Sequence, residues 1–365
     1  MNNIYNIYPN LKKHGHKIAL YDDFLNRLNP QLTEDLNTLL EDHQYVFLLR
    51  DEILSVDYIQ ILHNLTKDIP PGRLFLFAAS LNPKVADYYY EYCEELGVRA
   101  IPLILSSLID MPVGQHTQPK ISTGVRKKKF LCFNRVPRVH RIMLLKGLHE
   151  RNLVDQGFVS FGFDPLTPDI VIDSFPPSIK DFLNEHKDKW PLLLDYDDIV
   201  SVSHTSMIDS SLYPLFENSY FSVVSETYFF NGTEQDPPHH WENNWQYVSV
   251  LAPFIFKDDI SITEKTFRAI FHKHPFIIAG APHSLAKIRE WGYQTFSPWI
   301  DESYDACEDH EARLEIILEE INRLCSLSDQ ELNKMINEMA DVLEHNYRLY
   351  INKPYNRQIT QEPVL

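Results

Sequence analysis

The sequence predicts an α/β fold of two domains, each a parallel sheet covered by helices. In the first half of the chain, continuous apolar runs of strand length alternate with stretches whose apolar residues recur at helical spacing. Short breaks separate these stretches, and such an alternation is typical of parallel strands joined by helical crossovers. A chain of 365 residues is also long for one hydrophobic core, which favours two domains over one.

The first half is predicted to form one α/β unit. Its apolar run YVFLLR is followed by a helix whose apolar residues recur between Val56 and Leu65. Gly97 stands where a helix C-terminus favours glycine, after a helix that starts at Asn82-Pro83. The expected elements are strands at 17–21, 45–50, 73–79 and 100–105, and helices at 32–41, 55–67 and 82–96.

Residues 110–126 are predicted to link the two domains. This stretch contains two prolines and two glycines and shows no apolar period, as expected of a connection. The predicted N-terminal domain covers residues 1–122, and the second domain covers 123–328. Residues 329–365 are predicted to form a C-terminal helix and tail that could cross back to the first domain.

The second half repeats the α/β pattern. Thr263 and Ser328 are expected to cap helices, and Ser328 forms a capping box with Glu331. Residues 165–189 are rich in loops and leave room for two short helical pieces. The expected elements are strands at 130–133, 159–163, 220–225, 275–279 and 294–296, and helices at 139–150, 263–272, 285–291, 301–324 and 328–350.

Composition and charge disfavour several classes of protein. The net charge of −17 argues against a protein that coats nucleic acid through a basic face. The four cysteines form no CxxC pair and fit neither a zinc site nor a disulfide framework, so free thiols in a reducing compartment are expected. The N-terminus lacks the apolar core of a signal peptide, and no run of 18 apolar residues occurs. We therefore expect a cytoplasmic protein without a membrane span, in the host cytoplasm if it is viral.

Three arginines follow the strand at 130–133, where the chain leaves the predicted sheet. They are Arg135, Arg138 and Arg141, and Asn134 precedes them. Ligands of open α/β sheets bind at the carboxyl ends of strands, where the start of a following helix attracts anions. The planar guanidinium can also hold two phosphate oxygens. The segment is thus a candidate phosphate site, although a solvated basic turn would show the same sequence.

Two further segments place carboxylates at the same edge of the predicted sheet, where the strands have their carboxyl ends. Thr263 can cap a helix that begins with Glu264 and Lys265, and a lysine there opposes the helix dipole, which suggests an anion nearby. Glu226 follows the apolar strand YFSVVS, where a carboxylate could bind a sugar hydroxyl or act as a base. Gly280 ends the next strand. A plain helix cap and an ordinary exposed glutamate are the alternatives to a functional role.

Several common catalytic motifs are missing from the sequence. It contains no GxSxG, no Walker loop and no GxGxxG, which weakens esterase, NTPase and dinucleotide-dehydrogenase functions. The histidines do not show HxxxH spacing with a third ligand nearby, so no metal site is expected. The histidines considered for such a site are His239, His240, His272 and His274.

Together these segments resemble the C-terminal domain of α1,3-fucosyltransferase-type glycosyltransferases. In that family an arginine-bearing helix follows a strand, a second strand ends in an acidic patch, and a (V/I)TEK helix start precedes a PVVxG strand. The tail at 291–305 is also similar to glycosyltransferase-like proteins of phages and marine microbes. The resemblance covers roughly 127–325, and its counterparts here are 130–141, 220–227, Ile262-Thr263-Glu264-Lys265 and 275–280.

The resemblance implies two Rossmann-like domains in a GT-B-like arrangement with an inter-domain cleft. It implies that Lys265 and either Arg138 or Arg141 bind the donor diphosphate, and that Glu264 binds the ribose. Thr227 replaces the asparagine of the family's Phe-Glu-Asn-Ser run, and 229–258 is an insertion, so fucose itself is not implied. The donor-binding residues expected on this basis are Asn134, Arg135, Arg138, Arg141, Thr263, Glu264, Lys265 and Gly280.

We therefore expect a hexosyl- or pentosyltransferase that moves a sugar from a nucleotide-diphosphate sugar to an acceptor hydroxyl, with no metal and no other cofactor. Cationic side chains would stabilise the departing diphosphate. The catalytic candidates are Glu226 and, near strand ends of the first domain, Asp22, Asp51 or Glu52. The acceptor would be a glycan or, alternatively, a hydroxymethylated base of phage DNA. A non-catalytic module that binds sugar nucleotides is a third hypothesis.

Overall fold

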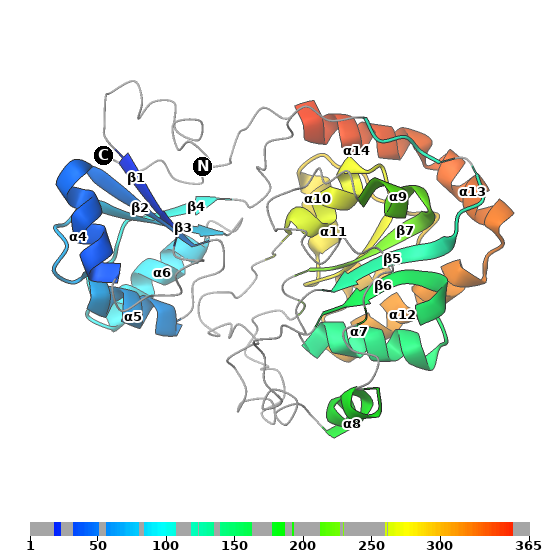
Figure 1. Ribbon diagram of the computed structural model, residues 1–365, viewed down its shortest axis with the longest axis horizontal. Helices are drawn as coiled ribbons and strands as arrows, with labels where there is room; N and C mark the ends of the chain where they lie inside the picture. The colour runs from blue at the N-terminus through cyan, green and yellow to red at the C-terminus, as the bar shows by residue number, and fades with distance from the viewer. Residues whose placement is uncertain are drawn as a thin grey trace.

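The computed structural model contains two parallel four-stranded sheets with helices packed on them (Figure 1). The mixed α/β class with parallel strands that the sequence predicts is therefore confirmed. The residues that the structure describes are 18–22, 32–50, 56–79, 84–106, 118–122, 124–134, 139–162, 177–186, 192, 212–226, 229, 260 and 262–352. Most of the predicted linker at 110–126 lies outside them.

The first sheet is built in sequence order. Its elements are β1 (Ile18–Asp22), α4 (Leu32–Asp42), β2 (Tyr45–Arg50), α5 (Val56–Thr66), β3 (Leu74–Ala79), α6 (Lys84–Glu95) and β4 (Leu103–Ser106). The strand order is β1-β2-β3-β4, so each strand pairs in parallel with its sequence neighbour. Buried apolar side chains from these strands and helices form a core of their own.

The second sheet has the order β6-β5-β7-β8, and all its pairs are parallel. Its strands are β5 (Lys128–Asn134), β6 (Gly157–Phe161), β7 (Ser219–Ser225) and β8 (Phe276–Ala279). Its α-helices are α7 (Val139–Glu150), α8 (Pro177–Glu185), α9 (Tyr213–Glu217), α10 (Glu264–Phe271), α11 (Ser284–Glu290), α12 (His310–Ser326), α13 (Asp329–Glu338) and α14 (Ala340–Asn352). Its described residues also form the 3-10 turns η1 (Val154–Gln156) and η7 (Ser303–Ala306).

Helices cover both faces of the second sheet. Helices α7 and α12 lie on one side, and α10 and α14 lie on the other (Figure 1). Phe267 and Phe271 of α10 pack against Tyr350 and Tyr347 of α14, with ring centroids 5.7 and 6.0 Å apart. As far as Asn352 the C-terminal helix therefore belongs to the core of this second unit.

Three C-terminal elements differ from the sequence prediction. No strand forms at 294–296, because the backbone of Gln294 pairs with the side chain of Asn346 instead of with a strand. The helix expected from residue 301 starts only at His310, where Asp309 caps it after η7. The helix expected over 328–350 is divided at Met339, which is fully buried in the core, so tertiary packing sets this break.

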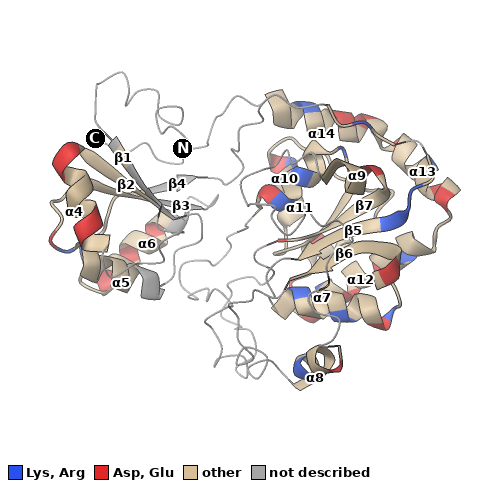
Figure 2. Cartoon of the chain, in the orientation of Figure 1, with Lys and Arg blue, Asp and Glu red and all other residues tan. Residues whose placement is uncertain are grey.

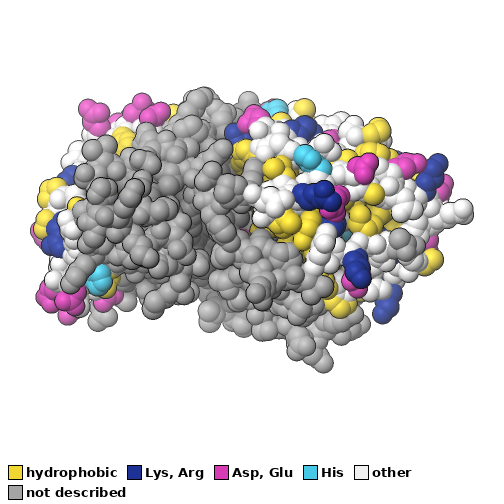
Figure 3. Space-filling model, turned by 90° about the horizontal axis from the view of Figure 1, so that it is seen from above, with side chains coloured by type: hydrophobic (Ala, Val, Ile, Leu, Met, Phe, Trp, Pro, Cys, Tyr) yellow, Lys and Arg dark blue, Asp and Glu magenta, His cyan; other side chains and the backbone are white. Residues whose placement is uncertain are grey.

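The charges differ between the two units. Helix α4 carries four acidic and no basic residues, and α6 carries four acidic and one basic residue (Figure 2). On the second unit, the described part of the face seen in Figure 3 shows basic and acidic side chains interspersed among hydrophobic ones. Within the described part of the chain, no helix has the length and apolar character needed to span a bilayer.

Candidate functional site

The topology of the second sheet defines one point where a ligand site is expected. From β5 the chain crosses through α7 to β6 on one side, whereas β7 and β8 lie on the other side of β5. The connections thus leave in opposite directions between β5 and β7, and open α/β sheets bind ligands outside the carboxyl ends of strands at such a switch point. In the first sheet the described strands follow sequence order, so no such reversal occurs among them.

Glu226, the residue after β7, lies at this switch point and is completely buried. Its Oε1 accepts hydrogen bonds from the backbone N–H of Thr263 at 3.0 Å and from the hydroxyl of Thr266 at 2.6 Å. Its Oε2 accepts the hydroxyl of Thr263 at 2.6 Å. A buried carboxylate is costly unless hydrogen bonds satisfy it, and here both oxygens are satisfied by the start of α10.

Thr263 is the N-cap of α10, as the sequence predicts. Its backbone is extended, and its hydroxyl oxygen accepts from the backbone N–H of Lys265 at 3.4 Å. The same oxygen accepts from the ammonium Nζ of Lys265 at 2.9 Å. This Nζ also lies 3.2 Å from Oε1 of Glu264 and 3.9 Å from Oε2 of Glu226. The lysine ammonium is therefore held between two carboxylates and a hydroxyl, while 26% of its side chain remains exposed.

The pKa of the Glu264 carboxyl is lowered in this environment. Burial raises the pKa of its carboxyl, but the charges of Lys265 and Arg268 and the hydrogen bonds around it bring the pKa below its ordinary value. The ionised form is the better acceptor of hydrogen bonds. The first turn of α10 thus presents one anionic and one cationic side chain next to each other.

Arg141 and His140, in the first turn of α7, hold the end of β7. The Nε2 of His140 donates to the carbonyl oxygen of Glu226 at 3.0 Å. The guanidinium of Arg141 donates to the same oxygen at 3.2 Å and to that of Ser225 at 3.5 Å. Both side chains are buried, so the strand end carries positive charge beneath the candidate site.

Asn134 ends β5 on the other side of the switch point. Its side-chain amide nitrogen donates to the Sγ of Cys132 at 3.2 Å. Among the described residues, its buried Oδ1 has no hydrogen-bond partner. Burial raises the pKa of the Cys132 thiol to about 11, despite the nearby Asn134 and the charge of Arg141, so this cysteine is a neutral thiol. Among the described residues, this amide oxygen therefore keeps an unused capacity to accept a hydrogen bond.

Gly280, which follows β8, lies beside the Cβ of Glu226. A Cβ on this residue would meet the Cβ of Glu226 at 3.4 Å, the Oγ of Ser284 at 3.3 Å and the Cγ2 of Ile278 at 3.0 Å. The absence of a side chain therefore allows β8 and the end of β7 to approach closely. Of the predicted site residues, the structure brings together Asn134, Arg141, Glu226, Thr263, Glu264, Lys265 and Gly280.

Sequence reasoning missed the buried Arg313 of α12, which secures the chain beyond β7. Its guanidinium donates to the carbonyl oxygens of Phe229, Cys307 and Glu308, and its Cζ lies 4.3 Å from the ring centroid of Phe229. The ring of Phe229 also stacks on His140, with 5.5 Å between centroids. A buried arginine within a helix leaves no local signal in the sequence, because its partners are more than eighty residues away along the chain or lie in a loop.

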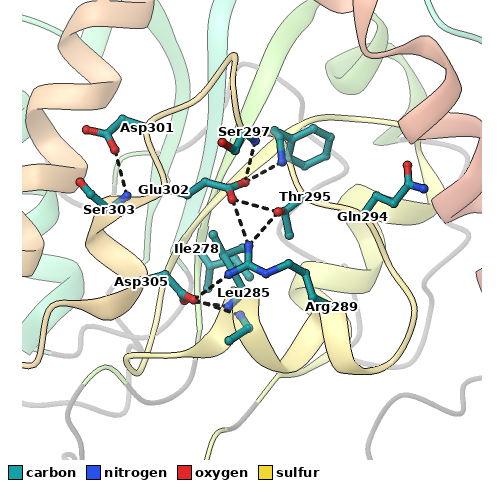
Figure 4. Close-up of polar contacts among 12 residues, drawn as sticks. Ile278, Leu285, Arg289, Gln294, Thr295, Ser297, Asp301, Glu302, Ser303 and Asp305 are labelled. Atoms are coloured by element: carbon teal, nitrogen blue, oxygen red, sulfur yellow. Dashed lines mark hydrogen bonds and ion pairs between the residues drawn. The ribbon is translucent and has the colours of Figure 1, made fainter.

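The tail at 291–305, which the sequence singled out, has a structural role. Glu302 accepts from the backbone N–H groups of Phe296 and Ser297 and from Thr295 (Figure 4). Asp305 accepts from the backbone N–H groups of Leu285 and Ala286, in the first turn of α11, at 2.7 and 3.0 Å. The Tyr304 hydroxyl accepts the N–H of Ile278 and so covers the edge strand β8.

Of the remaining predicted residues, the structure describes only Asp22. Asp22 ends β1 in the first sheet, whereas Asp51, Glu52, Arg135 and Arg138 lie outside the described residues. Within the described ranges, no three His, Cys, Asp or Glu side chains are grouped so that they could hold a metal ion. Comparisons of the chain with protein-family models, curated proteins and solved structures give no match.

Proposed function

We propose that the protein is a glycosyltransferase that moves a sugar from a nucleotide-diphosphate sugar to an acceptor hydroxyl without a metal. The observation that carries this proposal is the pairing of Lys265 with Glu264 at the first turn of α10, beside the switch point of the second sheet. An ammonium group at a helix start can pair with phosphate oxygens together with the free N–H groups there. An ionised glutamate next to it can accept hydrogen bonds from the ribose diol.

Two further features of the site support a donor of this class. The buried Oδ1 of Asn134, which has no hydrogen-bond partner among the described residues, can accept a hydrogen bond from a sugar hydroxyl. Arg141 adds a buried positive charge behind the end of β7, which favours the charge that develops on a departing diphosphate. We propose that Asp22 or Asp51, at strand ends of a GT-B-like first domain, accepts the proton of the acceptor hydroxyl. The acidic helices α4 and α6 favour a glycan over DNA as acceptor, because like charges repel.

The proposal is tested by screening nucleotide sugars for an increase in melting temperature, followed by titration calorimetry on the best ligand. Lys265→Ala and Arg138→Ala should each weaken binding by at least about tenfold, since each removes a charge-assisted contact to phosphate. Lys287→Ala is the matched control, because within the described part of the chain the Lys287 ammonium pairs with the exposed Glu290 of α11 and with no other carboxylate. If no nucleotide sugar binds, or if both site variants keep the wild-type affinity, the proposal is wrong.

A further inference from the structure

We propose that Glu226 is a positioning residue that orients Lys265 through Thr263, and that it does not accept a proton in the reaction. The inference rests on the proposed function for its ligand, but its geometric basis is independent of the ligand's identity. A general base must come within about 2.6–3.2 Å of the proton that it removes. The side chain of Glu226 has no exposed surface, and donors from α10 already occupy both of its oxygens.

The carboxylate takes the place of a residue that a helix normally supplies itself. In a capping box, a glutamate at position N3 accepts the backbone N–H of the N-cap residue. In α10 that position holds Thr266, and Glu226 accepts the N-cap N–H from the end of β7. The hydroxyl of Thr266 binds the same carboxylate oxygen. The first turn of α10 is therefore anchored to the sheet at the switch point.

This anchor determines which way the Thr263 hydroxyl points. The hydroxyl has a single proton, and donating it to Oε2 of Glu226 leaves its lone pairs to accept from the backbone N–H and the Nζ of Lys265. The carboxylate thus acts on the lysine through one intervening oxygen, and directly at 3.9 Å. Loss of its charge would release both the hydroxyl rotor and the ammonium group that is proposed to bind the diphosphate.

The informative substitution is Glu226→Gln, which keeps the size of the side chain. Its amide nitrogen would face donors, so the Thr263 hydroxyl would have to turn. Binding of inorganic pyrophosphate, UDP and GDP, measured by calorimetry, should weaken by about tenfold or more, and Thr263→Val should have a similar effect. Thr263→Ser keeps the hydroxyl and should rescue binding. The control is Ser328→Ala, which removes the cap of α13 away from the site and should leave pyrophosphate affinity unchanged.

A kinetic measurement separates positioning from proton transfer. With the nucleotide sugar found in the screen, Glu226→Gln should raise KM for the donor more than it lowers kcat, and the acid limb of the pH–rate profile should remain. A general base would give the opposite result: a fall in kcat of about 10²–10⁴ with unchanged donor affinity, and loss of that limb. This second result would overturn the inference.

A chemical readout decides the inference even if the proposed function fails. Lys265 should react slowly with an amine-modifying anhydride in the wild-type protein and at least about threefold faster in Glu226→Gln and Thr263→Val, measured by peptide mass spectrometry. Lys287 provides the internal reference in the same samples. If the reactivity of Lys265 is the same in the wild type and in both variants, Glu226 does not position it. Absence of binding by pyrophosphate, UDP and GDP in the wild type would instead contradict the donor site alone.

Discussion

The carboxylate of Glu226 binds both the backbone N–H and the hydroxyl of Thr263, a residue 37 positions later in the chain. This pair joins the end of β7 to the start of α10 and therefore brings together the two ends of the segment between them. Closing a loop of that length costs conformational entropy, which the buried hydrogen bonds must offset. Two segments that the sequence suggested separately, Glu226 and Thr263–Lys265, are thus parts of one polar cluster.

The Thr266 hydroxyl should contribute measurably to stability. Thr266→Val replaces it with a methyl group of similar shape and removes one donor from the buried Oε1 of Glu226. We expect the free energy of unfolding, from urea denaturation, to fall by about 1–3 kcal/mol. Thr266→Ser keeps the donor and should lose about 1 kcal/mol or less. Equal stability of the valine variant and the wild type would show that the bond is not important.

Stability should decrease in mild acid because of two buried histidines. Burial, with the nearby charge of Arg268, lowers the pKa of His272 to about 3, and burial, with the charge of Arg126, lowers that of His274 to about 3. Their unfolded pKa is about 6.5, so the unfolded chain binds more protons below that pH. The stabilisation is complete above pH 6.5 and is lost as the pH falls toward 3, by up to about 1.4 kcal/mol per pH unit for each histidine.

Urea midpoints measured from pH 7.5 to 5 test this pH dependence, since most carboxylates remain ionised in that range. The double variant His272→Gln/His274→Gln should lose the larger part of the slope, although it will be less stable. Part of the remaining slope should come from His310, because burial and the charge of Arg313 lower its pKa to about 4. His345 is exposed and bonds only to the carbonyl of Gly292 among the described residues, so His345→Gln should keep the slope. A slope that is unchanged in the double variant would assign the acid sensitivity to other groups.

Gly147 should not tolerate a side chain, because α7 and α12 touch at this residue. A Cβ there would lie 2.9 Å from Cδ2 and 3.1 Å from Cγ of Leu318, and it would also overlap Cδ1. Gly147→Ala should therefore cost about 1–3 kcal/mol of unfolding free energy, although alanine favours a helix. The cost should shrink in a Leu318→Ala background, which restores space. Gly124→Ala should be nearly neutral, because a Cβ there would have no described atom within 4 Å.

Arg313 should be more sensitive to a conservative change than an exposed arginine. Its forked guanidinium serves three carbonyl oxygens, including that of Phe229, and a lysine cannot serve all of them. We expect Arg313→Lys to lower the free energy of unfolding by about 2–4 kcal/mol. Arg348→Lys, at an exposed ion pair with Glu344, should change it by about 0.5 kcal/mol or less. Similar losses in the two variants would contradict the role of Arg313.

The local sequence of this chain predicted those strands, helices and caps that depend on residues close together in the chain. Apolar runs predicted β2, β3 and β7, helical periodicity predicted α5, and a threonine before a charged first turn predicted the cap of α10. These signals survive in the structure because strand pleating, helical periodicity and capping act within a few residues. The placement of Asn134 and Glu226 after strands followed from the same local patterns.

Tertiary structure decided the rest. The order β6-β5-β7-β8, and hence the switch point, depends on pairings between strands far apart in the sequence. The burial of Glu226 depends on donors 37 and 40 residues away, and the break at Met339 depends on the core that surrounds it. A glutamate after a strand is the same local signal whether it is exposed or buried. Only the contacts that satisfy its oxygens distinguish a base open to substrate from an anchor inside the fold, and such contacts have no local period in the sequence.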